Sequence, residues 1–494
     1  MIQKQRLCLL TCVAMTCGIL SGPLSAGELY VGGATVNITP EPPVALDGMR
    51  ARRIAKEVAA PCTASALVLE TREGDRSVEQ VIFVSCDLIA IRGGDDFYAS
   101  VREQIQGRVP DTALNRLVIN ATHTHWAPVL MDGKYDLDKF QGQVLQPADY
   151  RKFLFKQLGD AIAAAWEKRV PARIAWGLGH ADVAQNRRAV YADGSAVMYG
   201  KTNQPSFRGI EGYEDHGVEV LYFWDQSDKL IATCINVAAP SQGAGGGKVH
   251  ADFWHHVREP LREKYGADLT VLAWCGAAGD QEVRSMYRQA AENRMEKLRG
   301  LNRIQELARR IIVAWEDVLS VVEKERHSDI ALEHRSKMIQ LPERKITEAE
   351  VAEARKEVAK WEQKPDDPSA PWNRNWHQGV VNRYEQQQQA PQFREMLLQA
   401  VRIGDVAIVT NDFELYTDYG VQMKARSPAL QTFVVQLCGS GSYLPTPRAV
   451  AGGGYSAVPQ STKVGPEGGQ VLVEESVELI KSLWQPASTS GKTP

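Results

Sequence analysis

The chain has 494 residues, with 57 Lys or Arg, 60 Asp or Glu and a formal net charge of −3. This balance argues against nucleic acid or an anionic membrane as a partner, because both require a concentrated basic face. The length is sufficient for one large domain or two ordinary ones, with a substantial hydrophobic core.

The first 26 residues have the features of a secretory signal peptide. Lys4 and Arg6 precede a largely apolar segment, residues 7–20, and Leu24-Ser25-Ala26 offers small residues for cleavage. The apolar run is about a dozen residues long, whereas a helix that spans a bilayer needs roughly 20. We therefore expect cleavage near Gly27, a secreted or periplasmic protein and no stable membrane insertion. An uncleaved membrane anchor is the alternative.

Five cysteines follow the predicted signal peptide: Cys62, Cys86, Cys234, Cys275 and Cys438. They are odd in number, far apart and without a CxxC pair. The sequence therefore predicts buried free thiols, not a disulfide framework or a zinc site made of cysteines. A bridge between Cys62 and Cys86 is the one exception that we consider.

Strand-like and helix-like segments alternate between residues 29 and 280. Runs rich in Val, Ile and Leu predict strands at residues 29–38, 66–70, 80–86, 117–120, 173–177, 218–224, 229–237 and 269–274. Apolar residues at three- and four-residue spacing predict helices at 97–106, 147–168 and 253–265. The predicted fold class is α/β, with a layered core.

The region from about 283 to 395 is more charged, and its composition favours helices at 286–321 and 346–363, with a short strand at 328–341. We interpret it as a helical insertion in a single domain that spans residues 27–485. The tracts 363–376 and 386–389 are expected to be surface connections. Strands at 396–410, a closing helix at 471–484 and a disordered tail at 486–494 complete the prediction.

His123 and His125 lie in the segment Asn120-Ala121-Thr122-His123-Thr124-His125, at the end of a predicted strand. Residues two apart on an extended backbone point to the same side, so both rings can face one cleft. Ligand sites lie at strand ends in α/β proteins, and imidazole is a common zinc ligand. The pair is therefore a candidate metal or substrate site. Two histidines satisfied by backbone groups are the structural alternative.

The histidine segment resembles the Ala-Thr-His-Thr-His signature of the neutral, non-lysosomal ceramidases and their bacterial relatives. Further segments resemble motifs of that family in the same order, at residues 32–40, 85–88, 186–188, 276–280, 413–415, 442–447 and 453–455. The resemblance spans nearly the whole mature chain. It implies an α/β fold with a layered, mixed-sheet catalytic domain of neutral-ceramidase type over residues 27–485, interrupted by the helical insertion.

The resemblance also implies a metal centre, in which His123, Glu414 and Tyr443 bind Zn²⁺. A zinc ion with an open coordination position lowers the pKa of its bound water from about 15.7 to near 7, which makes hydroxide available at neutral pH. The structural alternative for Glu414 is a buried carboxylate paired for stability.

The resemblance assigns His125, Arg187 and Tyr455 to holding or polarising the carbonyl group of the substrate. It assigns Asp280, in the loop Gly276-Ala277-Ala278-Gly279-Asp280, to orienting the metal-bound water or a histidine. The alternatives are that Arg187 and Arg188 are an ordinary surface pair, that Tyr455 braces a turn and that Asp280 caps a helix.

This chain departs from the family pattern at several positions. Pro240 lies in the segment 236–242, where the family has its second histidine ligand, and proline cannot bind a metal. Either three protein ligands suffice, as in many catalytic zinc sites, or His250 enters through the loop 243–248. Cys275 lies near the place of a catalytic serine, and a thiol without a base is more often a buried apolar residue. Phe413 stands where the family has glycine.

Three kinds of function follow from these observations. The first is metal-dependent hydrolysis of an amide or ester bond in an N-acyl, ceramide-like substrate. The second is a carbohydrate-active enzyme on the same scaffold, acting on a polar glycan, which Pro240 and the missing serine favour. The third is a binding protein with a decayed site. The expected ligand is thus a small molecule, a lipid amide or a glycan, and the sequence does not predict the oligomeric state.

Overall fold

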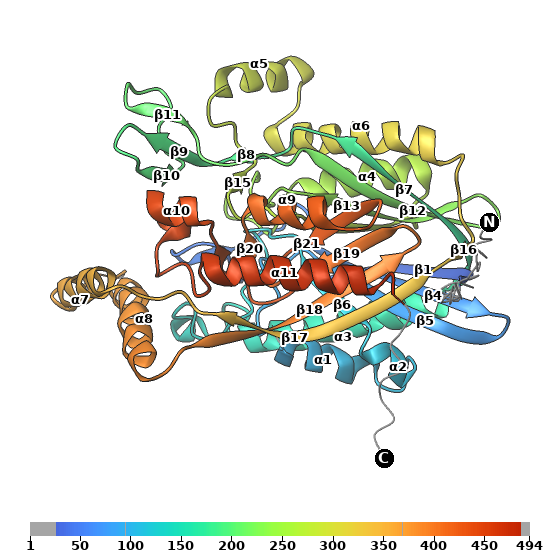
Figure 1. Ribbon diagram of the computed structural model, residues 1–494, viewed down its shortest axis with the longest axis horizontal. Helices are drawn as coiled ribbons and strands as arrows, with labels where there is room; N and C mark the ends of the chain where they lie inside the picture. Colours follow the sequence, from blue (N-terminus) through green and yellow to red (C-terminus); the bar gives the residue numbers. More distant parts are fainter. Residues whose placement is uncertain (1–25, 94, 368, 486–494) are drawn as a thin grey trace, which may run out of the picture.

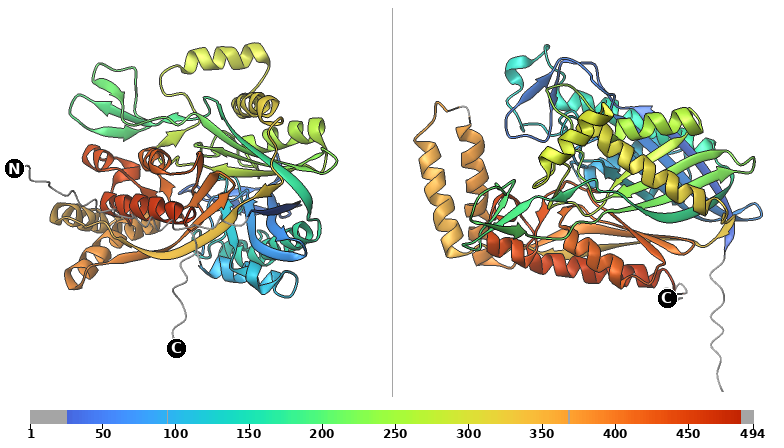
Figure 2. Two further views of the ribbon diagram at one scale, coloured as in Figure 1. Left: turned by 45° about the vertical axis from the view of Figure 1, so that its right-hand side comes forward. Right: turned by 90° about the horizontal axis from the view of Figure 1, so that it is seen from above.

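Two β-sheets lie face to face in this chain, and helices cover the outer face of each sheet (Figures 1 and 2). The computed structural model describes residues 26–93, 95–367 and 369–485. The predicted signal peptide, apart from Ala26, and the predicted tail at 486–494 lie outside the described residues. The layered α/β fold with mixed sheets that the sequence predicts is confirmed.

The larger sheet has the strand order β14-β13-β12-β7-β1-β4-β5-β6, and β16 (Asp329–Ile330) adds to β1. Its strands are β1 (Gly27–Asn37), β4 (Thr63–Glu73), β5 (Arg76–Cys86), β6 (Leu117–Ala121), β7 (Val170–His180), β12 (Gly217–Asp225), β13 (Leu230–Val237) and β14 (Thr270–Cys275). Neighbouring strands are antiparallel, except for the parallel pairs β5 with β6 and β13 with β14.

The larger sheet curls until β14 lies against strands at the other end of the sheet. The Ala273 carbonyl accepts hydrogen bonds from Ser85 Oγ at 2.6 Å and from Asn120 Nδ2 at 3.1 Å. These polar side chains are buried, and the bonds compensate for their loss of water. The ends of β6 and β14, far apart in the strand order, are thereby close in space.

The smaller sheet has the order β17-β18-β19-β21, and β19 and β21 are parallel. Its strands are β17 (Leu332–Pro342), β18 (Phe393–Ile403), β19 (Val406–Thr410) and β21 (Gln431–Val435). Apolar side chains from both sheets form the core between them. The Trp274 ring centroid lies 5.3 Å from that of Phe83 and 5.8 Å from that of Phe433. Such aromatic contacts bury a large apolar area and hold the sheets together.

Amphipathic helices cover the outer faces of the sheets. The larger sheet is covered by α1 (Asp95–Ile105), α3 (Pro147–Glu167), α4 (Phe253–Tyr265) and α6 (Arg303–Val322), and the smaller sheet by α9 (Thr417–Arg426) and α11 (Pro466–Ser482). In α3, the buried residues Leu154, Leu158, Ile162 and Ala165 recur at three- and four-residue spacing, which places them on one face. The predicted helices at 97–106, 147–168 and 253–265 are confirmed within a few residues.

The remaining elements are short. The strands are β2 (Val44–Leu46), β3 (Arg53–Ala55), β8 (Gln185–Asn186), β9 (Arg188–Tyr191), β10 (Ala196–Met198), β11 (Phe207–Ile210), β15 (Gln281–Glu282), β20 (Glu414–Leu415) and β22 (Tyr443–Leu444). The helices are α2 (Asp111–Leu114), α10 (Pro447–Gly452) and the 3-10 turns η1 (Asp138–Phe140) and η2 (Tyr455–Ala457).

The region 283–395, expected to be one helical insertion, is divided among different layers. After α5 (Gln289–Arg299), α6 packs on β7 and β12, while β17 and β18 belong to the smaller sheet. A hairpin of α7 (Glu348–Glu362) and α8 (Ala370–Gln389) connects β17 to β18 and projects from the body (Figure 1). The prediction of surface connections at 370–376 and 386–389 is wrong, because these residues belong to α8. Periodicity indicates a helix but not the surface on which it packs.

The five cysteines of the described residues are free and buried, as predicted, and Cys62 and Cys86 are not bridged. Within residues 26–93, 95–367 and 369–485, no helix combines the length and the apolarity that a membrane crossing requires.

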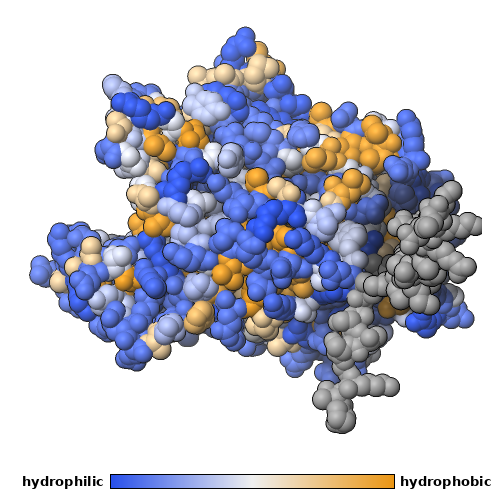
Figure 3. Space-filling model, viewed as in Figure 1, coloured by the Kyte–Doolittle hydropathy of each residue, from blue (hydrophilic) through white to orange (hydrophobic). Residues whose placement is uncertain are grey.

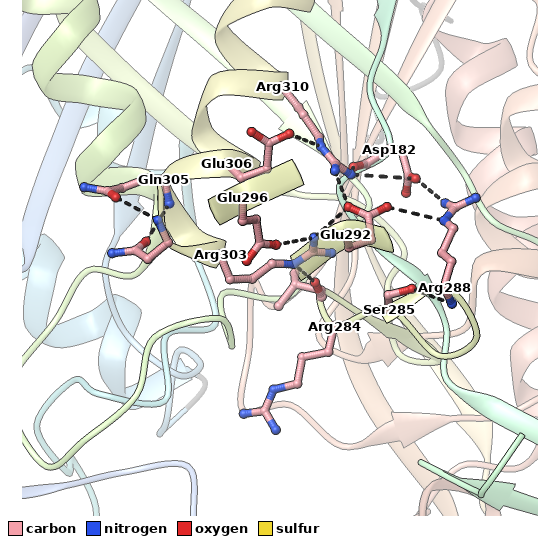
Figure 4. A network of polar contacts seen from close by, with 12 residues as sticks. Asp182, Arg284, Ser285, Arg288, Glu292, Glu296, Arg303, Gln305, Glu306 and Arg310 are labelled. Carbon is pink, nitrogen blue, oxygen red and sulfur yellow. Dashed lines mark hydrogen bonds and ion pairs between the residues drawn. The ribbon is translucent and has the colours of Figure 1, made fainter. Parts of the chain in front are cut away.

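A network of ion pairs joins α5 and α6 to the loop that follows β7 (Figure 4). Arg310 pairs with Glu292 of α5, with Glu306 one turn earlier in α6 and with Asp182. Glu306 also accepts hydrogen bonds from Arg309 at 2.9 Å and from Arg299 at 3.0 Å. The hydrogen bond from Arg309, and then that from Arg310, lower the pKa of the Glu306 carboxyl to about 2, although burial opposes them.

We expect Glu306→Gln to lose less free energy of unfolding than the wild type when the pH is lowered. A carboxyl whose pKa falls on folding stabilises the native state above its unfolded pKa, near 4.5, and this contribution is lost as the pH falls towards about 2. In urea unfolding, the wild type should lose more free energy of unfolding between about pH 6 and about pH 3 than the variant does. Glu353→Gln, at a surface pair in α7, is the control. Equal losses in the wild type and Glu306→Gln would contradict the assignment.

Candidate active site

The carboxyl ends of three parallel strand pairs come together at one end of the sheets. Ala121, at the end of β6, donates its N–H to the Leu437 carbonyl beyond β21 at 3.2 Å. Gln436 N donates to the Cys275 carbonyl of β14 at 2.9 Å, and Ser241 Oγ, beyond β13, donates to the Thr122 carbonyl at 2.7 Å. Loops from both sheets therefore form one polar site.

Glu414 and Tyr443 lie opposite each other in the short parallel pair of β20 and β22. The Gln436 amide fixes the carboxylate loop, because its Oε1 accepts from Leu415 N at 2.9 Å and from Ala278 N at 3.2 Å. Gly279 N donates to the Leu415 carbonyl at 2.7 Å. A Cβ at Gly279 would lie 2.2 Å from the Glu414 carbonyl oxygen, so only glycine fits here.

His123 presents one ring nitrogen to Glu414. Its Nδ1 lies 2.8 Å from the Ile89 carbonyl, which can only accept, so Nδ1 carries the proton. Its Nε2 lies 3.5 Å from Glu414 Oε2. The expectation of an extended backbone here is wrong, because His123 has φ +67°, in the left-handed region. A strained backbone at such a position is typical of functional sites.

His125 and His123 nevertheless face each other, as the sequence predicts. Their Nε2 atoms are 3.3 Å apart, and the rings meet edge to face with centroids separated by 4.9 Å. The side-chain amide of Gln242 also contacts His125 Nε2 directly. Burial, with the charges of His123 and Arg187, holds the pKa of His125 well below its usual range, so this ring is neutral at physiological pH.

Arg187 is a buried cation, with 2% of its surface exposed. Its Nη1 donates to the Tyr199 hydroxyl at 2.7 Å, and its Nη2 donates to the Gly279 carbonyl at 2.9 Å and to the Tyr443 hydroxyl at 3.4 Å. Burial lowers the pKa of Arg187, but Tyr199 and Tyr443 lead the groups that outweigh it, so the guanidinium stays charged. The interpretation as a surface pair with Arg188 is wrong, because both side chains are buried.

The pKa of the Glu414 carboxyl is lower than usual, although burial alone would raise it. The charge of His123 and then that of Arg187 favour the carboxylate, and Tyr443 donates a hydrogen bond to it. Burial is the main cause that raises the pKa of the Tyr443 phenol well above its ordinary value. Glu414 is therefore an anion at neutral pH, 17% exposed, between a histidine and a protonated phenol.

Tyr455 connects the site to the surface. Its ring centroid lies 5.6 Å from that of Tyr443, and the residue is 42% exposed. Arg188 holds the preceding loop by donating to the Gly453 carbonyl at 2.6 Å and to the Ala449 carbonyl at 3.1 Å. Arg188 is itself neutralised by Glu211 at 2.6 Å.

Asp280 is a buried positioning residue and contacts no histidine among the described residues. Its Oδ2 accepts from Asn186 Nδ2 at 2.7 Å, and its Oδ1 accepts from the backbone and hydroxyl of Thr417. Its carbonyl accepts from Arg187 N at 2.8 Å. Asp280 thus holds the backbone of Arg187. As the helix-cap alternative expects, its carboxylate also accepts the N–H of Thr417, the first residue of α9, although Asp280 itself precedes β15.

His250 lies outside the group formed by the other candidate residues. Its Nδ1 accepts from Asp252 N at 2.8 Å, and its ring packs against His256 at the start of α4. Burial is the largest cause that lowers the pKa of His250 to about 4. In the described structure, the His250 ring has no hydrogen bond or ring contact with His123, Glu414 or Tyr443.

Gln242 and Tyr199 are site residues that the sequence analysis missed. Gln242 contacts both His125 and Arg187, with its Oε1 3.4 Å from Arg187 Nη1. It lies two residues after Pro240, so a search of that segment for any polar side chain could have found it. Tyr199 has no comparable sequence signal, because it reaches Arg187 from the separate hairpin of β9 and β10.

The side chains of this site fit a zinc ion. With zinc–ligand bonds of about 2.0–2.1 Å, two ligands of a tetrahedral ion are separated by roughly 3.3–3.4 Å. The 3.5 Å between His123 Nε2 and Glu414 Oε2 matches this separation. With its proton on Nδ1, the imidazole of His123 would offer the lone pair of Nε2 to the ion. The third ligand atom would be the phenol oxygen of Tyr443, which lies opposite Glu414 in the pair of β20 and β22. No cluster of three or more His, Cys, Asp or Glu side chains able to hold a metal occurs within the described ranges.

Comparisons with solved structures identify the fold. Neither a protein-family model nor a curated protein sequence matches the chain. Solved structures do match, among them a ceramidase complexed with C2 and the neutral ceramidase from Pseudomonas aeruginosa, with TM-scores of 0.66 and 0.64. Each is 14% identical and covers 95% of this chain, which spans 77% and 76% of those chains. The chain has the fold of the neutral ceramidases.

We expect Cys275 to resist alkylation in the native protein. Burial is the main cause that raises the pKa of its thiol to about 12, so the reactive thiolate is scarce at about pH 8. The Sγ atom donates to the Ala239 carbonyl at 3.3 Å and is buried. Iodoacetamide followed by peptide mass mapping should label Cys275 only after urea unfolding. Rapid labelling of Cys275 in the native protein would instead support a nucleophilic role for this residue.

Proposed function

We propose that this protein is an exported, zinc-dependent hydrolase that cleaves an amide or ester bond of an N-acyl, ceramide-like substrate. The observation that carries the proposal is the approach of His123 Nε2 to a Glu414 oxygen at 3.5 Å, with Nδ1 bound to the Ile89 carbonyl. The ceramidase fold supports a hydrolase of this kind. Export rests on the signal-like composition of residues 1–26.

His123, Glu414 and Tyr443 would hold the zinc ion. When bound, zinc supplies a water acidic enough to provide hydroxide near neutral pH. In the overall reaction, the oxygen of water bonds to the carbonyl carbon, the C–N or C–O bond breaks, and the amine or alcohol leaves with a proton.

Arg187 would stabilise the negative charge that develops on the carbonyl oxygen. Its charge is fixed in place by Tyr199 and the Gly279 carbonyl before any substrate binds, so little reorganisation is needed. The neutral ring of His125 can accept a proton or orient the carbonyl group, and Gln242 holds that ring in position. Tyr455, at the surface, would contact the substrate on entry.

A polar glycan is the second candidate substrate, and an aromatic group beside the site favours it. Trp372 and Trp376 of α8 stack at 5.2 Å, and Trp376 lies 6.3 Å from Tyr455. Aromatic side chains combine an apolar face with polar edges and suit ligands of mixed polarity.

We expect the purified wild type to contain about one zinc ion per chain and His123→Ala to contain little, because catalytic zinc sites with three protein ligands lose affinity when one is removed. The matched control is His180→Ala, an exposed histidine at the end of β7. Elemental analysis after dialysis measures the content. Equal, negligible zinc in the wild type and His123→Ala would end the metal-dependent mechanism.

We expect Arg187→Met to lower kcat by roughly 10²–10³ with a smaller change in KM, because the charge acts mainly on the transition state. Arg208→Met, at an exposed position in β11, should leave both constants unchanged. The assay compares N-acyl amides, esters and glycans side by side. Turnover of glycans alone would favour the second candidate, and no turnover by zinc-loaded protein would favour a binding protein.

A further inference from the structure

A group of cationic side chains lies near His125. Arg53 donates from Nη2 to the carbonyl oxygen of His125 and, at 2.6 Å, to that of Asp47. Lys134 forms an ion pair with the Asp47 carboxylate. A Cβ at Gly48 would lie 2.6 Å from the His125 ring, so this loop touches the active-site histidine directly. We name Arg53, Lys134 and Arg92 the cationic cluster.

The cationic cluster has more positive charge than its neighbours neutralise. Asp47 is the carboxylate that pairs with it, whereas Asp132 and Asp136, in the same loop as Lys134, pair with Arg151 and Lys139. Tyr135 adds no negative charge, because burial is the main cause that raises the pKa of its phenol to about 12.

The pKa of Lys134 indicates the same excess of positive charge. Burial is the largest cause that lowers the pKa of Lys134, and the charges of Arg92 and Arg53 lower it further against the opposing effect of Asp47. The charge of Arg187 also acts on the His125 ring, together with those of Arg53 and Lys134. Several positive charges therefore act together on the His125 ring.

Donor groups in the cationic cluster lack acceptors. Arg53 Nε and Arg92 Nε are both buried without a hydrogen-bond partner. Across the described residues, the Arg92 guanidinium makes no hydrogen bond or ion pair, although its charge acts on Lys134 and Tyr135. Buried donors without partners are costly, and a ligand that supplies oxygen acceptors removes that cost. A guanidinium also matches a carboxylate in shape, because it can donate two parallel bonds.

We propose that the substrate carries a carboxylate close to its scissile carbonyl group, as an N-acyl amino acid does, and that Arg92 and Lys134 bind this carboxylate. The inference rests on the proposed hydrolase and specifies its substrate class. An uncharged sphingoid amide would leave the donors of the cationic cluster unpaired, whereas an acidic substrate satisfies them and is oriented with its carbonyl group towards His125.

The test compares an N-acyl amino acid with the corresponding neutral N-acyl amino acid amide, which differ only in the charged group. We expect a preference of roughly tenfold or more for the acid in kcat/KM, since a charge-assisted hydrogen bond supplies a factor of that order. Arg92→Gln should raise KM for the acid by roughly tenfold, with a smaller change in kcat, and so reduce the preference. Arg92→Lys should retain part of it. Arg108→Gln, at a surface pair with Asp160, is the matched control and should keep the full preference.

Failure of this inference can be told apart from failure of the proposed function. Equal kcat/KM for the acid and the amide, or a preference that Arg92→Gln does not change, overturns the acidic substrate while hydrolysis stands. If neither compound is cleaved, the hydrolase proposal fails, and calorimetric titration of both compounds decides the inference. Tighter binding of the acid that is weakened by Arg92→Gln supports it, and equal binding overturns it. Matching thermal unfolding of the Arg92 variants and the wild type excludes misfolding as the cause.

Discussion

The packing of the two sheets through their shared apolar core is the constraint on which the rest of the site depends. Trp274 of the larger sheet and Phe433 of the smaller sheet interlock, and this contact fixes how the strand ends lie relative to each other. The Gln436 side chain then joins the loops after β14 and β19 with a single amide oxygen. Because Glu414 follows β19 of the smaller sheet and His123 follows β6 of the larger sheet, their 3.5 Å approach is a direct consequence of sheet packing.

The site also shows how a buried arginine is tolerated. Arg187 gives up water but gains the hydroxyls of Tyr199 and Tyr443, the Gly279 carbonyl and the field of Glu414. A buried charge with this many partners is stable in place, and its guanidinium is preorganised for developing negative charge. Asp280 acts on Arg187 indirectly. Its carbonyl fixes the backbone of Arg187, and its carboxylate accepts hydrogen bonds from Asn186 and Thr417.

The departures from the ceramidase pattern have structural counterparts. The segment around Pro240 offers no imidazole, and instead Gln242 reaches the site and contacts His125. Cys275 is a buried thiol hydrogen-bonded to Ala239 and Gln436, which suits a packing role. Under the proposal of an acidic substrate, this chain shares its fold with the matched ceramidases but not their substrate, because function depends on the residues of the site and not on the fold.

The sequence by itself determined the local elements. The strands of the larger sheet, the helices α3 and α4 and the histidine pair follow from hydrophobic periodicity and from one short segment, and these depend only on neighbouring residues. Resemblance placed Glu414, Tyr443, Arg187 and Tyr455 near the histidines. Only the tertiary structure decided that His250 lies apart, that Gln242 and Tyr199 belong to the site, and that 283–395 is shared between layers. These outcomes depend on contacts between distant segments, for which a single sequence contains no periodic signal.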